Sequence, residues 1–158
     1  MENDRLREKA RQRAFRLLAL RARSEKELRA KLTEKGFDGE TVDRVVAELH
    51  ELHYLDDRSF AREWARNLAV NRLLGNRRIE ASLREKGIPA DAARQVTDTV
   101  REEISEKEAI RRIVRKKTKG QKHATSDDKE KRRLARSLMG KGFPPGLIFE
   151  ILSIREEE

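Results

Sequence analysis

One acidic pair and one histidine pair lie close together in the sequence and could perform acid–base or metal chemistry. Asp56 and Asp57 are adjacent carboxylates, and His50 and His53 lie three residues apart just before them. A metal-dependent hydrolase that uses Asp56, Asp57 and His53 is therefore one alternative. Adjacent acids at a helix start more often cap that helix, and zinc would need further ligands that the sequence does not supply. We therefore expect helix capping, with no metal, no cofactor and no enzymatic activity.

Three basic segments offer a different chemistry, the binding of phosphate or carboxylate groups. The chain of 158 residues has a formal net charge of +9, which suggests a polyanionic partner such as DNA or an acidic protein surface. The candidate binding residues are Arg21, Arg23, Arg72, Arg77, Arg78, Lys116, Lys117, Lys119 and Lys122. We interpret them as a segmented basic rim. A solvated surface that only keeps the protein soluble is the alternative.

The elements that would position these segments follow from a phrase that occurs three times. It reads apolar, three residues, apolar, two residues, Lys-Gly-apolar, and its glycines Gly36, Gly87 and Gly142 lie 51 and 55 residues apart. Each glycine is expected to end a helix, Gly36 in the left-handed conformation of a C′ residue. Each basic segment then forms the turn between the first two helices of a unit. The pattern predicts three tandem three-helix repeats, with boundaries at residues 1–52, 53–104 and 105–158, the last with an acidic C-terminal tail.

Composition agrees with an all-α fold. Helix-forming residues dominate, no segment alternates like a strand, and 42% of the residues are charged against 36% apolar, which predicts a thin core. The expected molecule is elongated and curved, with helix-turn-helix-like units. It contains no cysteine and no apolar run long enough to span a bilayer. We therefore expect a cytoplasmic protein, and a monomer because the repeats cover one another's faces.

Local signals place several helix ends and one apolar stripe. Ser24 and Glu27 have the spacing of a capping box, and a further helix should begin after Asp38 or Gly39. The residues Phe60, Trp64 and Leu68 share one helical face, which favours core packing over the stacking of nucleic-acid bases. Stacking remains open for Tyr54.

Several of these residues together resemble the bacterial RecX family. The resemblance covers about residues 14–152, and it is most specific between Leu52 and Ile88. The residues that carry it are Ser24, Leu28, Leu32, Gly36-Phe37, Tyr54-Leu55-Asp56-Asp57, Phe60-Ala61, Gly75, Ile79, Leu83 and Lys86-Gly87-Ile88.

The resemblance implies tandem three-helix repeats and a regulatory function. RecX proteins regulate the RecA recombinase, generally by inhibiting its ATPase, coprotease and strand-exchange activities on single-stranded DNA. It therefore implies a RecA filament as the partner, bound in the filament groove or at its end, and some members also bind DNA directly. A general DNA-binding module of helix-turn-helix-like repeats, with no RecA partner, is the alternative.

Overall fold

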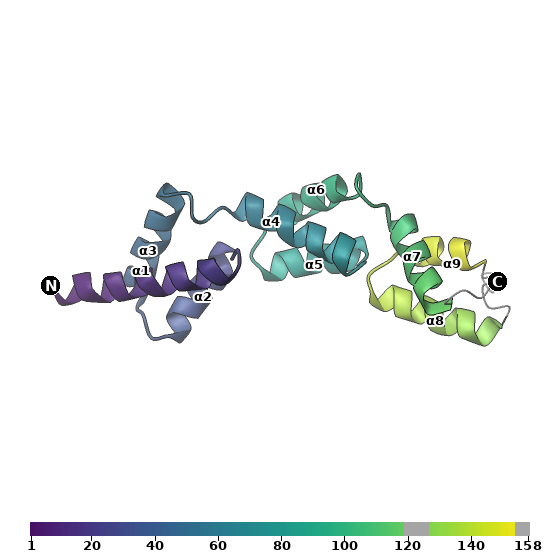
Figure 1. Ribbon diagram of the computed structural model, residues 1–158, viewed down its shortest axis with the longest axis horizontal. Helices are drawn as coiled ribbons and strands as arrows, with labels where there is room; N and C mark the ends of the chain where they lie inside the picture. The colour runs from purple at the N-terminus through teal and green to yellow at the C-terminus, as the bar shows by residue number, and fades with distance from the viewer. Residues whose placement is uncertain (119–126, 154–158) are drawn as a thin grey trace.

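The computed structural model shows an elongated all-α molecule in which three-helix repeats follow one another along the long axis (Figure 1). It describes residues 1–118 and 127–153, and this part contains no strand. None of the helices within it is long and apolar enough to cross a membrane. The acidic tail expected at the C-terminus falls in residues 154–158, outside the described part.

Each repeat contributes three helices to the described part of the chain. The first repeat consists of α1 (Glu2–Leu20), α2 (Glu25–Glu34) and α3 (Gly39–Glu51). The second consists of α4 (Asp57–Arg66), a π-helical turn η1 (Asn67–Asn71), α5 (Asn76–Glu85) and α6 (Ala90–Val100). The third consists of α7 (Glu106–Thr118), α8 (Asp128–Gly140) and α9 (Pro145–Leu152).

The second helix of each repeat ends at its Lys-Gly pair. Gly36, Gly87 and Gly142 have φ angles of +96°, +88° and +94°, in the left-handed region that glycine adopts without strain. The N–H of the apolar residue after each glycine donates to a carbonyl five residues back, as from Phe37 to Leu32 at 3.3 Å. These bonds form Schellman motifs, which satisfy the last carbonyls of the helix. The prediction for Gly36 is confirmed, and the same geometry holds at the other two glycines.

Side-chain caps begin several helices where the sequence indicated. Ser24 and Glu27 form a complete capping box at the start of α2, and Asp38 caps α3. Between Phe60 and Leu68 the expected continuous helix changes, because α4 ends at Arg66 and continues as η1. Phe60 and Leu68 remain buried in the core across this change.

The three repeats enclose two separate apolar cores. The core of the first repeat consists of side chains from α1, α2 and α3 and of Leu55 from the segment before α4, with Leu28, Leu32 and Val45 fully buried at its centre. The second and third repeats share one continuous core, in which Ile79, Leu83 and Leu138 are fully buried. Since burial of apolar surface is the dominant stabilising contribution to folding, the last two repeats form one packed body and the first repeat forms another.

Both junctions between repeats use the same capping arrangement. Asp57 at the start of α4 accepts the N–H of Glu25 at the start of α2, at 2.9 Å. Glu106 at the start of α7 accepts the N–H of Asn76 at the start of α5, at 3.2 Å. A carboxylate at a helix N-terminus satisfies a free N–H and interacts favourably with the helix dipole. Each following repeat thus caps the second helix of the preceding one.

The second junction also brings two backbones into close approach. The N–H of Gly75 donates to the carbonyl of Lys141 at 2.8 Å, and the N–H of Arg77 donates to that of Gly142 at 3.3 Å. A Cβ atom at Gly75 would lie 2.4 Å from the backbone of Gly142. Only a glycine at position 75 allows this contact.

Candidate polyanion-binding surface

The basic turn of the first repeat is engaged in contacts within the molecule. The guanidinium of Arg21 pairs with Glu27 and lies 5.6 Å from the centre of the Trp64 ring. Arg23 donates from Nε to the carbonyl of Leu17 at 3.4 Å, and burial, followed by the charge of Arg21, lowers its pKa. Both side chains therefore make contacts within the protein.

The basic turn of the second repeat lies against the third repeat. Arg77 donates from Nη2 to the carbonyl of Met139 at 3.4 Å, and Arg78 donates from Nη1 to that of Gly140 at 2.7 Å. Both side chains are exposed and reach the C-terminal end of α8. Arg72 is also exposed, after η1. This turn therefore adds its charge to the surface of the third repeat.

The basic turn of the third repeat is described only in part. Lys116 and Lys117 are exposed in the last turn of α7, and Lys117 donates from Nζ to Oγ of Ser137 in α8 at 3.1 Å. Lys119 and Lys122 lie outside the described residues. Lys117 therefore lies beside α8, on the same repeat that Arg77 and Arg78 contact.

A row of cations on α8 joins these two groups. Lys129, Arg133 and Arg136 are exposed and recur at helical spacing, on the face opposite the buried Leu138. The same face ends at Gly140, where Arg78 binds. We use the name basic band for the exposed surface formed by Arg77, Arg78, Lys117, Lys129, Arg133 and Arg136.

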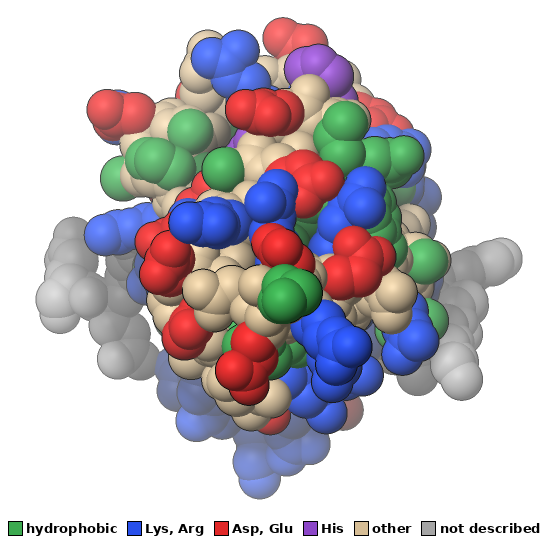
Figure 2. Space-filling view, turned by 90° about the vertical axis from the view of Figure 1, so that its left-hand side faces the viewer, with side chains coloured by type: hydrophobic (Ala, Val, Ile, Leu, Met, Phe, Trp, Pro, Cys, Tyr) green, Lys and Arg blue, Asp and Glu red, His purple; other side chains and the backbone are tan. Residues whose placement is uncertain are grey.

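The basic band has an unneutralised positive charge. None of its six side chains pairs with a carboxylate in the described part of the chain, whereas many cations of the first repeat are paired. Figure 2 shows acidic and basic side chains interspersed at the end of the molecule that the first repeat forms. Of the net charge of +9, residues 105–158 carry +6, residues 1–52 carry +2 and residues 53–104 carry +1, so the positive charge is concentrated on the third repeat.

Lys129, Arg133 and Arg136 lie on a helix and not in one of the three basic turns, where the sequence predicted the site. Their spacing of four and three residues, opposite the apolar positions of the same helix, is the signal that could have found them. The band begins in the second repeat because the charge at one position of the repeated phrase changes sign after the first repeat. The residue before the first apolar position of the phrase is Glu27 in the first repeat, Arg78 in the second and Arg133 in the third.

Asp56, Asp57 and His50 make structural contacts within the molecule. Asp56 caps α4 by accepting the N–H groups of Arg58 and Ser59, and these hydrogen bonds, chiefly from Ser59, lower its pKa. His50 contacts Glu25 at 2.5 Å between Nε2 and Oε1. The described residues contain no group of three or more acids or histidines that could hold a metal ion. The prediction that Asp56 caps a helix is confirmed.

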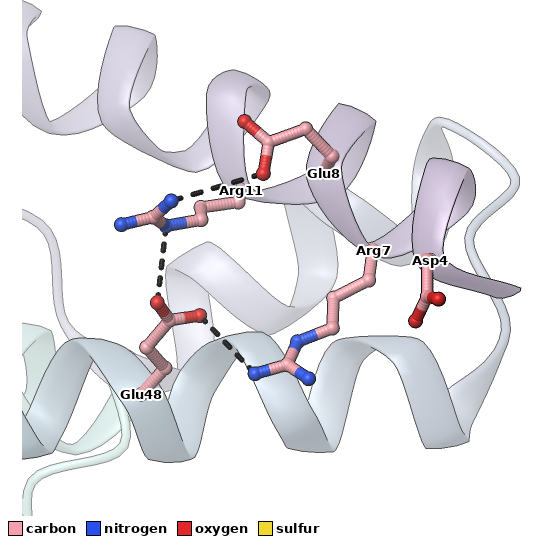
Figure 3. A pocket seen from close by; sticks show the side chains of 5 residues that line it. All are labelled: Asp4, Arg7, Glu8, Arg11 and Glu48. Atoms are coloured by element: carbon pink, nitrogen blue, oxygen red, sulfur yellow. Dashed lines mark ion pairs between the residues drawn. The ribbon is translucent and has the colours of Figure 1, made fainter. Parts of the chain in front are cut away.

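An open hollow between α1 and α3 is lined by charged side chains (Figure 3). Glu48 lies 3.1 Å from Arg11 and 3.7 Å from Arg7, while Glu8 is 3.7 Å from Arg11. Asp4 completes the lining. The three acids outnumber the two arginines, so this hollow lacks the excess of positive charge that distinguishes the basic band.

Comparison with known proteins identifies the family of the chain. Models of the first, second and third three-helix domains of RecX match residues 10–49, 56–96 and 105–152. The chain is 36% identical to the regulatory protein RecX of Amycolatopsis mediterranei over 94% of its own length and 83% of that protein. It is 32% identical to the regulatory protein RecX of Corynebacterium efficiens, over 89% and 69% of the two chains.

A solved structure agrees with the fold. The crystal structure of RecX from Lactobacillus salivarius superposes with a TM-score of 0.75, at 21% identity, over 95% of this chain and 96% of that one. The repeat order and the three family matches thus coincide along the chain. The chain therefore belongs to the RecX family, whose members are regulators of the RecA recombinase and not enzymes.

Proposed function

We propose that this protein inhibits RecA by binding to filaments of RecA on single-stranded DNA, with the basic band as its main contact surface. A monomer of elongated shape bridges successive filament subunits, and its cations face the acidic surface of the groove or the enclosed DNA. This steric and electrostatic action reduces the ATPase, coprotease and strand-exchange activities of RecA. The proposal puts the protein in the bacterial cytoplasm.

The observation that carries the proposal is the unpaired charge of the basic band on a rigid support. From Lys129 to Gly140 the band follows about 16 Å of helix at 1.5 Å per residue. Arg77 and Arg78 extend it across the junction with the second repeat. Because the two repeats share a core, the spacing of these cations is fixed before binding, which lowers the entropic cost of association.

The test measures RecA ATPase on single-stranded DNA with this protein at a substoichiometric ratio. The wild-type protein should inhibit the ATPase, and the double variant Arg133→Glu/Arg136→Glu should inhibit about tenfold less, since two charge reversals weaken contacts to an anionic partner. The double variant Arg5→Glu/Arg16→Glu on α1 has the same change in charge outside the band and serves as the control. Circular dichroism checks that both variants remain helical.

The outcomes separate the parts of the proposal. Full inhibition by the α8 variant would remove the basic band from the mechanism. Equal loss of inhibition by both variants would indicate that net charge alone matters. An inactive wild-type protein would contradict inhibition of RecA itself.

Direct DNA binding without a RecA partner is the second candidate, and the unpaired cations at helical spacing favour it. Binding to single-stranded DNA through phosphates should then weaken with salt, with a log–log slope of about −0.7 per phosphate contact. Loss of Arg133 and Arg136 should reduce this slope by roughly 1.4. A protein that inhibits RecA filaments but has no affinity for naked DNA at low salt would exclude this candidate.

A further inference from the structure

The first repeat meets the second through charged and aromatic side chains, and the two repeats do not share an apolar core. The buried residues of the first repeat form one cluster together with Leu55, which precedes α4, and the other buried residues of the second and third repeats form another. Ion pairs between partly exposed groups contribute less than apolar burial and weaken with salt. The junction between the first and second repeats is therefore the weaker of the two.

Four side chains form the charged and aromatic part of this contact, which we call the Glu27 cluster, and Asp57 adds its hydrogen bond from the N–H of Glu25. Arg21 and Glu27 belong to the first repeat, and Trp64 and Lys86 belong to the second. Lys86 Nζ lies 3.1 Å from Oε2 of Glu27, and the Arg21 guanidinium pairs with the same carboxylate. Lys86 and Arg21 also lie 5.0 Å and 5.6 Å from the centre of the Trp64 ring. Glu27 thus holds together two cations that would otherwise repel each other.

The junction between the second and third repeats has a different construction. Arg78 occupies the position of Glu27, so the acid that could pair with Lys141 is absent there. Arg78 instead donates to the carbonyl of Gly140 at 2.7 Å. The shared core and the backbone hydrogen bonds from Gly75 to Lys141 and from Arg77 to Gly142 fix the two repeats together.

We propose that the first repeat is a hinged arm, held on the second repeat by the Glu27 cluster and released when Glu27 loses its pairing with Lys86. The helices of the arm stay folded on release, because its core consists of side chains of α1, α2 and α3 and of Leu55, which lies before α4 and stays with the arm. The second and third repeats keep their relative orientation. This conformational change is a property of the free protein and does not depend on RecA binding.

Distance measurements between spin labels test the proposal on the full chain, which contains no cysteine that could interfere. The label pair Ala47→Cys/Ala92→Cys reports across the first junction, and Ala92→Cys/Gly146→Cys reports across the second; all three sites are exposed. Glu27→Gln removes the charge but keeps the side-chain acceptor of the capping box. Lys86→Met removes the cation without touching that box. Glu34→Gln, at the exposed end of the same helix, is the matched control.

We expect Glu27→Gln and Lys86→Met to raise the ratio of undocked to docked molecules about tenfold, because each removes a charge-assisted hydrogen bond. A second, broader peak should appear in the distance distribution across the first junction. About 1 M sodium chloride should increase the fraction of molecules in this peak. The second junction should keep one narrow distance throughout. Circular dichroism should remain that of the wild-type protein, and Glu34→Gln should behave as wild type.

Trp64 provides an independent measurement, since it is the single tryptophan of the chain. Its emission should shift in Glu27→Gln and Lys86→Met as the cations leave the ring, and should not shift in Glu34→Gln. Two results would overturn the proposal. One is a distribution of label distances across the first junction that is as narrow as the distribution across the second, in both variants at high salt. The other is a loss of helical signal in both variants, which would show that the first repeat does not hold its fold without the junction.

Discussion

Glu27 combines a helix cap and two ion pairs in one half-buried side chain. It accepts the backbone N–H of Ser24 at 3.3 Å and pairs with Arg21 and Lys86. Burial raises the pKa of Glu27, but the hydrogen bonds from Arg21, Lys86 and Ser24 lower it by a larger amount, so that the pKa is about 2. The docked structure therefore requires the ionised carboxylate.

This pKa predicts how stability changes with pH. A carboxyl group whose pKa is depressed in the folded state stabilises that state above its ordinary pKa of about 4.5, and this contribution is lost as the pH falls toward 2. Glu27→Gln should lower the free energy of unfolding at pH 7 by about 2–3 kcal/mol. Urea unfolding should show this difference from wild type shrinking between pH 5 and pH 2. A difference that stays constant over this range would contradict the role of the charge.

Among the helices, the most regular feature is the end of the second helix in each repeat. All three ends use a glycine at positive φ, but their surroundings differ. A Cβ atom at Gly36 would meet nothing within 4 Å, whereas one at Gly142 would lie 2.6 Å from the backbone nitrogen of Arg78. A glycine at the same position of the phrase therefore only ends a helix in the first repeat, whereas in the third repeat it also contacts the second repeat.

Two alanine substitutions separate these roles. Gly36→Ala should cost about 1 kcal/mol, the backbone strain of a left-handed alanine. Gly142→Ala adds a collision with the backbone of Arg78, and should cost about 1–3 kcal/mol more. Urea unfolding of the two variants measures the difference. Equal losses would show that the second repeat can shift to admit the methyl group.

At the scale of the whole molecule, the division into two cores predicts two units of cooperative unfolding. Leu32 and Leu138 occupy the same position of the repeated phrase, and both are fully buried. They belong to different cores. A cavity at one position should therefore weaken only the repeats that share its core.

Hydrogen exchange tests this division with a matched pair of variants. Leu138→Ala should cost about 2–5 kcal/mol and accelerate exchange in α4–α9, while α1–α3 keep their protection. Leu32→Ala should have the opposite pattern. Loss of protection along the whole chain in both variants would show a single cooperative unit.

The sequence by itself determined the all-α class, the tandem repeat and several helix ends. The capping box of Ser24 and Glu27 and the stop at Gly36 depend on residues within about five positions, so local spacing was sufficient to predict them. The match of spacing among three units indicated the tandem architecture. The change from α4 to η1 was not predicted, because the apolar spacing of Phe60, Trp64 and Leu68 does not distinguish the two kinds of turn.

Only the tertiary structure decided which repeats share a core and which cations have partners. Lys86 meets Glu27 across 59 residues, and Arg78 meets Gly140 across 62. Such pairings depend on the angle at which whole repeats pack, which no local spacing encodes. Four arginines that look alike in the sequence consequently differ. Arg21 lies in the first junction and Arg23 bonds within the first repeat, while Arg77 and Arg78 join the exposed row on α8.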